Sequence, residues 1–125
     1  MKIKVLVSPT FQAALGKLTN QELPLRTSFY LKGVLKKNVE ESKKYEDVRL
    51  EALSRVADKN EDGSMKVDAN NQVHLSPENL IKFQGELNAL LETEVELGSV
   101  KLSELGEKAS LSPNDLLALE GLVLE

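Results

Sequence analysis

The stretch from Asp58 to Ala69, DKNEDGSMKVDA, opens with the D-x-N-x-D-G spacing of an EF-hand calcium loop. Asp58, Asn60, Asp62 and Gly63 would fill the first half of that loop. Its last position must supply a carboxylate that binds calcium through both oxygens, and this position is Ala69. The residues that follow favour a strand, whereas an EF-hand needs a second helix. We therefore predict a polar turn here and no metal site.

Two other groups of side chains could in principle carry acid–base chemistry. His74 is the one histidine, and a catalytic or metal-binding histidine needs an orienting partner that its neighbours in V-H-L do not supply. Glu92, Glu94 and Glu96 would share one face of an extended segment, which is more simply a solvated strand face than a carboxylate site. Phosphate-binding loops, dinucleotide-binding glycine patterns and nucleophile elbows are absent. We expect a non-enzymatic protein without catalytic residues, metal or cofactor, and a small hydrolase using the glutamates is the weakest alternative.

Basic residues accumulate along one predicted helix in the first half of the chain. Lys32 and Lys36 are one helical turn apart, and Lys43 follows two turns later, so the three could form a stripe. Such a stripe could meet nucleic-acid phosphates, but Glu40 and Glu41 interrupt it and no nucleic-acid motif accompanies it. We favour a surface that contacts solvent or a protein partner, with DNA or RNA binding as an alternative. The candidate interaction surface comprises Arg26, Lys32, Lys36, Lys37, Lys43, Lys44 and Tyr45.

The elements that must position these residues can be predicted from periodicity and from three Ser-Pro helix starts. Alternation predicts a short strand over residues 2–7, and Ser8-Pro9 predicts a helix over residues 9–18. A long helix is expected from about Pro24 to Ala57, with a break near Gly33 or Asn38 or with part of its apolar stripe facing another helix. That stripe is Leu31, Leu35, Val39, Ser42, Tyr45, Val48, Ala52 and Val56.

The second half of the chain is predicted to mix short strands with helices. Residues 64–68 and 72–75 favour a β-hairpin around Ala69-Asn70-Asn71, and Ser76-Pro77 opens a helix expected to reach about Thr93. Extended segments are expected at 94–97 and 100–102, then a helical turn from Ser103. A helix begins at Ser112-Pro113, and the apolar tail should dock. The fold class is therefore α+β and mostly helical, with the long helix antiparallel to the 77–93 helix and short β-strands at one end.

Length and composition set outer limits on this interpretation. The 125 residues are typical of a single domain, expected to cover residues 1–125. Without cysteine the chain offers no disulfide or thiolate site, and no apolar run is long enough to predict a membrane span. Net charge is −4, but about +6 lies in residues 1–44 and about −10 in the rest. Such asymmetry is typical of a partner-binding surface or of halves that pack together.

The order of segments resembles that of small uncharacterised proteins of tailed bacteriophages and prophages of Gram-positive hosts. The most specific parts of the resemblance are LLETEVEL and LSPNDLLALE. The resemblance implies a phage origin and no particular activity. We expect a virion or assembly accessory that acts by protein–protein contact and self-associates through the long helix, in the host cytoplasm during infection or in the virion. The alternatives are an early phage inhibitor of a host factor or defence system, and a nucleic-acid binder.

Overall fold

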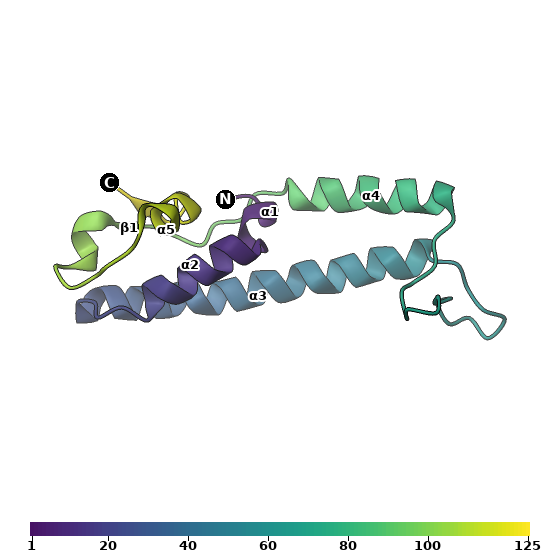
Figure 1. Ribbon diagram of the computed structural model, residues 1–125, viewed down its shortest axis with the longest axis horizontal. Coiled ribbons are helices and arrows are strands. Elements are labelled where there is room, and N and C mark those ends of the chain that lie inside the picture. The colour runs from purple at the N-terminus through teal and green to yellow at the C-terminus, as the bar shows by residue number, and fades with distance from the viewer. The chain divides into compact units, whose positions relative to one another are not determined.

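The structure is a computed structural model that describes residues 1–125, and the chain forms two compact units (Figure 1). The first unit contains Met1–Ser42 and Glu94–Glu125, and the second contains Lys43–Thr93. The long helix α3, Leu25–Val56, contributes its first part to one unit and its second part to the other. The single domain expected from chain length stays a prediction.

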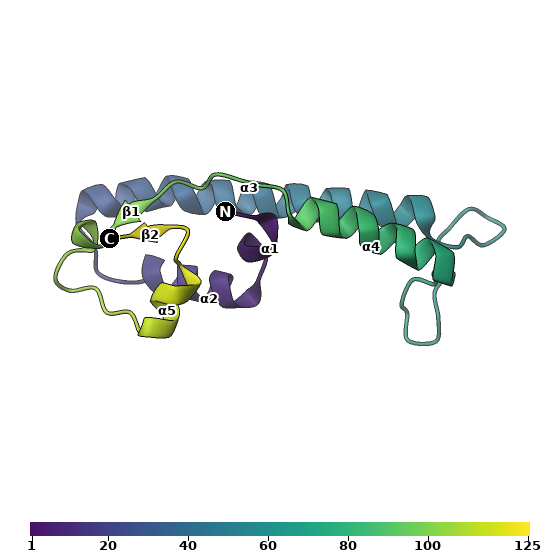
Figure 2. The same ribbon diagram turned by 90° about the horizontal axis from the view of Figure 1, so that it is seen from above.

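The first unit combines helices with a minimal parallel sheet. It contains α1 (Ile3–Leu6), α2 (Pro9–Thr19), the first part of α3, β1 (Val100–Lys101), the 3-10 helix η1 (Leu102–Leu105), α5 (Pro113–Ala118) and β2 (Val123–Leu124). β1 and β2 pair in parallel, with Val100 opposite Val123, and they lie side by side in Figure 2. The helical turn expected from Ser103 and the docked apolar tail are thereby confirmed.

One hydrophobic core holds the first unit together. Leu6, Leu18, Leu119 and Leu122 are fully buried, and Phe11 is the largest buried side chain. These residues come from α1, α2 and the C-terminal segment, so segments far apart in sequence close the same core. The α2 helix was predicted correctly because its buried residues recur at helical spacing and Ser8 Oγ accepts a hydrogen bond from the Phe11 backbone N–H at 3.2 Å.

The strand predicted over residues 2–7 is wrong, because Ile3–Leu6 is a short helix. Only Lys2 forms a β-bridge, with Glu94. Ile3 and Leu6 are buried one helical turn apart, whereas Val5 is 38% exposed. Leu6 also accepts a hydrogen bond from Gln12 Nε2 at 2.6 Å. A run of mixed apolar residues this short fits both periods, and packing against α2 decides between them.

The long helix was predicted to within about one residue at each end, and it continues through Gly33 and Asn38 without a break. Its buried side in the first unit differs from the predicted stripe. Thr27, Leu31, Val34 and Asn38 are buried, whereas Val39 is 67% exposed. Asn38 can be buried because its side-chain amide exchanges two hydrogen bonds with Gln12, at 2.9 and 3.0 Å.

The second unit is a helical hairpin closed by a loop region. The second part of α3 packs antiparallel to α4, Pro77–Leu91, and the chain direction is visible from the colours in Figure 1. The hairpin predicted over residues 64–68 and 72–75 is present as one isolated bridge, Val67 with Val73, and a second bridge joins Met65 to Lys59, which lies outside the predicted strands. Its turn places Asn71 at φ 63°, a left-handed conformation that asparagine tolerates. The mostly helical α+β class and the antiparallel helix pair are thus confirmed, and no helix is long and apolar enough to cross a membrane.

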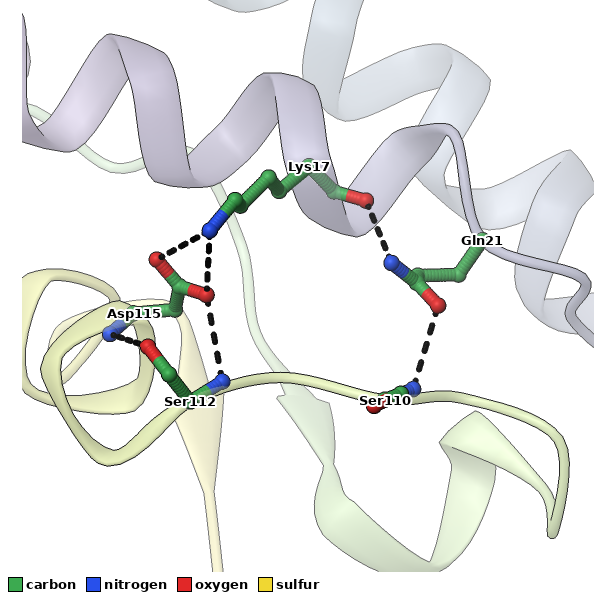
Figure 3. A network of polar contacts seen from close by, with 5 residues as sticks. All are labelled: Lys17, Gln21, Ser110, Ser112 and Asp115. Carbon is green, nitrogen blue, oxygen red and sulfur yellow. Dashed lines mark hydrogen bonds and ion pairs between the residues drawn. The ribbon is translucent and has the colours of Figure 1, made fainter.

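A polar network fastens α5 to α2 in the first unit (Figure 3). Lys17 Nζ donates to Asp115 Oδ1 and Oδ2 at 3.5 and 3.2 Å, and the Ser112 N–H donates to Asp115 Oδ2 at 3.1 Å. The Gln21 side-chain amide donates to the Lys17 carbonyl and accepts a hydrogen bond from the Ser110 N–H. The Ser112 N–H is the largest cause that lowers the pKa of Asp115, and Lys17 adds a smaller effect.

We expect the free energy of unfolding of Asp115→Asn to decrease less between neutral and acidic pH than that of the wild type. A carboxylate whose pKa is lowered by folding stabilises the protein above its unfolded-state pKa of about 4, and this stabilisation is lost as the pH falls through the folded value. Urea unfolding between neutral pH and about pH 2 measures the slope. Lys17→Ala should keep most of the acid dependence, because the Ser112 N–H remains. Identical pH profiles for the wild type and Asp115→Asn would contradict this assignment.

Candidate functional site

All seven predicted surface residues lie on α3, but they are distributed over both units. In the first unit the four basic residues are exposed, which leaves them available to a partner or to solvent. In the second unit Lys43 and Lys44 are exposed, whereas Tyr45 is half-buried. At about 100° per residue, Tyr45 points roughly opposite Lys43 around the helix. The structure therefore does not bring the seven residues to one face.

Two of the predicted lysines share a face with large exposed apolar side chains. Leu25 is 87% exposed, Phe29 77% and Val39 67%, and Lys32 and Lys36 lie between Phe29 and Val39 along the helix. The spacings are four, three, four and three residues, which places all five on one side of α3 and is typical of a helix that packs lengthwise against another helix. We call Leu25, Phe29, Lys32, Lys36 and Val39 the apolar–basic face.

The rotation of α3 within the first unit determines which residues form this face. Thr27 Oγ1 donates to the Glu104 carbonyl at 2.5 Å, and Tyr30 Oη accepts from the Ser99 N–H at 2.9 Å. Gly98 has φ 110°, and a side chain there would collide with the Tyr30 hydroxyl. These contacts hold one side of α3 against the 97–105 segment, so Phe29 is directed outward.

Sequence reasoning missed the two residues that expose the most apolar surface. Leu25 and Phe29 follow Pro24 in the first turns of the helix, and the prediction treated this region only as a helix start. The signal that could have found them is the repeat of alternating four- and three-residue spacing from Leu25 to Val39. The predicted buried stripe included Val39, which hid this repeat.

The second unit contains a different apolar surface. Val48 and Ala52 of α3 and Phe83, Leu87 and Leu90 of α4 line an open groove of about 260 Å³. Ala52 is buried, but Val48 is 40% exposed, and no residue of α4 is fully buried. We call this surface the α3–α4 groove.

Charges of both signs border the α3–α4 groove. Arg49, Arg55 and Glu86 also line it. The Arg49 guanidinium donates to both carboxylate oxygens of Glu46, at 3.1 and 2.6 Å, and this hydrogen bonding is the main reason that the pKa of Glu46 is lowered. Arg55 and Glu86 form a looser ion pair at 4.0 Å. The border of the groove is therefore nearly neutral as a whole.

Two carboxylates of the EF-hand-like stretch make local contacts. Asp62 Oδ1 accepts from the Ser64 N–H and hydroxyl at 3.0 and 2.6 Å, and the hydroxyl is the main cause of the lowered pKa of Asp62. Asp58 Oδ2 lies 2.6 Å from His74 Nδ1, so His74 does have a carboxylate neighbour that the sequence did not reveal. No cluster of three or more His, Asp or Glu side chains with metal-ligand geometry occurs. This stretch is built as a hydrogen-bonded turn.

The row of glutamates and a hollow beside α1 offer no arrangement typical of catalysis. Glu94 Oε2 lies 3.1 Å from the Met1 amino nitrogen, so it serves as a structural ion pair in the first unit. A hollow of about 540 Å³ is lined mainly by apolar atoms, including those of Val5, Phe11 and Leu117. Its charged lining residues, Lys4 and Glu120, do not form a recognised catalytic arrangement.

Comparisons of the chain with protein-family models, with curated proteins and with solved structures found no match. Functional argument therefore depends on the chain's own surfaces. Its most prominent ones are the apolar–basic face and the α3–α4 groove.

Proposed function

We propose that this chain is a non-enzymatic phage protein that acts by protein–protein contact, as a virion or assembly accessory that also self-associates. The observation that carries the proposal is the exposure of Leu25 and Phe29, at 87% and 77%, in a helix face with regular spacing. Large aromatic and aliphatic side chains of this kind are typical anchors of protein interfaces. The proposed phage origin rests on the resemblance of LLETEVEL and LSPNDLLALE, and the proposed setting is the host cytoplasm during infection or the virion.

The chemistry of the apolar–basic face defines the partner that it fits. A partner helix would offer apolar residues to Leu25, Phe29 and Val39, and acidic residues to Lys32 and Lys36. A second copy packed through the same face in parallel register would place like-charged lysines opposite one another. The face therefore favours a different, acidic protein, and self-association is assigned to another surface.

Two further candidate functions would use the same residues. An early inhibitor of a host factor would bind that factor through the apolar–basic face, and its gene would lie among early phage genes rather than among structural ones. A nucleic-acid binder would stack a base on Phe29 while Lys32 and Lys36 contact phosphates. The exposed aromatic ring beside two lysines is the observation that keeps nucleic acid as the second candidate.

We expect the double variant Leu25→Ser/Phe29→Ser to lose its protein partner. The experiment captures partners from phage-infected host cells on the purified protein, identifies the captured chain, and then measures its affinity directly. Removing two large anchors should weaken binding at least tenfold, since each anchor is worth more than about 1 kcal/mol. The control is Ile81→Ser, because Ile81 is 70% exposed on α4 and lies outside the face.

Two results would count against this proposal. Equal binding of the partner by the double variant and the wild type would remove the apolar–basic face as the contact surface. Binding to a single-stranded oligonucleotide that falls steeply with salt, and falls further in Lys32→Glu/Lys36→Glu, would favour the nucleic-acid alternative.

A further inference from the structure

The two units differ sharply in how well they bury apolar side chains. The first unit buries fourteen hydrophobic residues, including Phe11 and eight leucines. The second unit, Lys43–Thr93, buries only Ala52 and Ala57. Its larger apolar residues along the two helices are half-buried or exposed. They are Tyr45, Val48, Leu50, Leu53, Val56, Leu80, Ile81, Phe83, Leu87, Leu90 and Leu91.

In this helical hairpin nothing covers the apolar side of the helix pair. Stable domains need a second layer to cover the apolar face of the first, and about 50 residues alone bury too little surface. Two facing helices share an apolar contact line, the seam, whose edges stay open to solvent. In a four-helix bundle a second pair of helices covers it. The open α3–α4 groove, about 260 Å³ in volume, is the uncovered part of that seam.

We propose that a second copy of this chain covers the α3–α4 groove, so that two hairpins form a four-helix bundle. The proposal rests on the self-association in the proposed function and identifies the surface that mediates it. In a two-fold dimer each groove meets the same groove of the other copy. Ala52 and Ala89 line the groove with small side chains, which allow the helices of the two copies to approach closely.

The charges around the groove favour a second copy of the chain over a partner that is strongly acidic or strongly basic. Arg55 and Glu86 lie together at the groove with opposite charges, so a two-fold axis can bring Arg55 of one copy near Glu86 of the other. Arg49 is already neutralised by Glu46. By contrast, Lys32 and Lys36 make the apolar–basic face repel a second copy in register. Of these two surfaces, the groove is the self-complementary one.

The size of the face sets the expected strength of the dimer. The 15 residues of α4 span about 22 Å, and two helices side by side are roughly 20 Å wide. Each copy thus offers roughly 450 Å², and the pair roughly 900 Å², which is below the usual size of about 1,200–2,000 Å². We therefore expect a dimer with a micromolar dissociation constant rather than a permanent one.

Sedimentation over about 1–500 µM protein tests this proposal, and thermal melting at the same concentrations tests its linkage to stability. The wild type should shift from monomer to dimer, and its Tm should rise with concentration. Val48→Glu places a charge in the mouth of the groove and should weaken association at least tenfold. Leu50→Glu is the matched control, because Leu50 is similarly exposed, at 44%, on the same helix but does not line the groove. Far-UV circular dichroism of the monomers verifies that both variants remain helical.

A charge-swap experiment gives a second readout that does not depend on Val48. Arg55→Glu makes the groove acidic and Glu86→Arg makes it basic, so each variant alone should dimerise more weakly than the wild type. An equimolar mixture should recover a heterodimer.

Several outcomes would overturn the four-helix bundle. These are a wild type that stays monomeric throughout, equal association by Val48→Glu and Leu50→Glu, or charge-swap variants that associate no better when mixed. Loss of the dimer in Leu25→Ser/Phe29→Ser would assign self-association to the apolar–basic face instead. Partner capture by Val48→Glu tests the proposed function separately, because the first-unit face is unchanged in that variant.

Discussion

Leu119→Ala is expected to lower the free energy of unfolding by about 2–5 kcal/mol, the range for leucine truncation in a packed core. Leu119 is fully buried, and its carbonyl accepts hydrogen bonds from the N–H groups of Leu122 and Val123, both at 2.8 Å. These backbone bonds hold Leu119 in place between α5 and β2, and its side chain lies in the core cluster of the first unit, which alanine would leave underfilled. Since the total stability of a small domain is about 5–15 kcal/mol, the variant should lose a large fraction of it. Urea unfolding followed by circular dichroism measures the change.

Leu117→Ala is the matched control for this experiment. Leu117 is two residues away, within α5, and is 65% exposed. Removing it should change the stability by no more than about 0.5 kcal/mol. Equal effects of the two substitutions would show that α5 does not dock against the core in solution.

Gln12→Leu is expected to cost about 1–3 kcal/mol, because it leaves buried polar groups without partners. Asn38 is only 7% exposed, and its side-chain amide hydrogen-bonds to Gln12 in both directions. Gln12 Nε2 also donates to the Leu6 carbonyl at 2.6 Å. The substitution therefore removes the side-chain hydrogen bonds that link α2 to α1 and α3.

The double variant Gln12→Leu/Asn38→Leu separates this interaction from simple loss of packing. Replacing both amides by leucines leaves an apolar contact instead of an unpaired amide, so its stability should exceed that of Gln12→Leu. Asn38→Leu alone should cost less than Gln12→Leu, because the bond from Gln12 to Leu6 survives. Urea unfolding of the four proteins yields the coupling energy. Strictly additive effects would argue that the two amides do not interact.

Local signals in the sequence were sufficient for the helices that begin at Ser-Pro pairs. Ser8, Ser76 and Ser112 each accept a hydrogen bond from a backbone N–H three residues later, at 3.1–3.3 Å. Such a cap involves only residues within one turn, so its type and spacing can be recognised without knowledge of the fold. The long helix was predictable for a related reason, since its apolar repeat extends over many turns.

Contacts between distant segments were not predictable in the same way. β1 pairs with β2 across more than twenty residues, and the short β2 strand has no pattern of its own. Residues 2–7 were assigned the wrong structure because four helical residues leave too little pattern to separate the two periods. The pairing of His74 with Asp58 likewise required the hairpin to fold back onto the end of α3.

The candidate surfaces also combine features that local sequence determines with features that only distant contacts determine. The sequence by itself determined that a long, charged helix carries Lys32 and Lys36 one turn apart, because helical geometry follows from local spacing. Only the tertiary structure decided that Phe29 faces outward while Leu31 is buried, because the hydrogen bonds of Thr27 and Tyr30 set the rotation of α3. It also showed that the second unit leaves its seam open. Burial depends on what packs against a helix, and that partner lies far away in the sequence or in another chain.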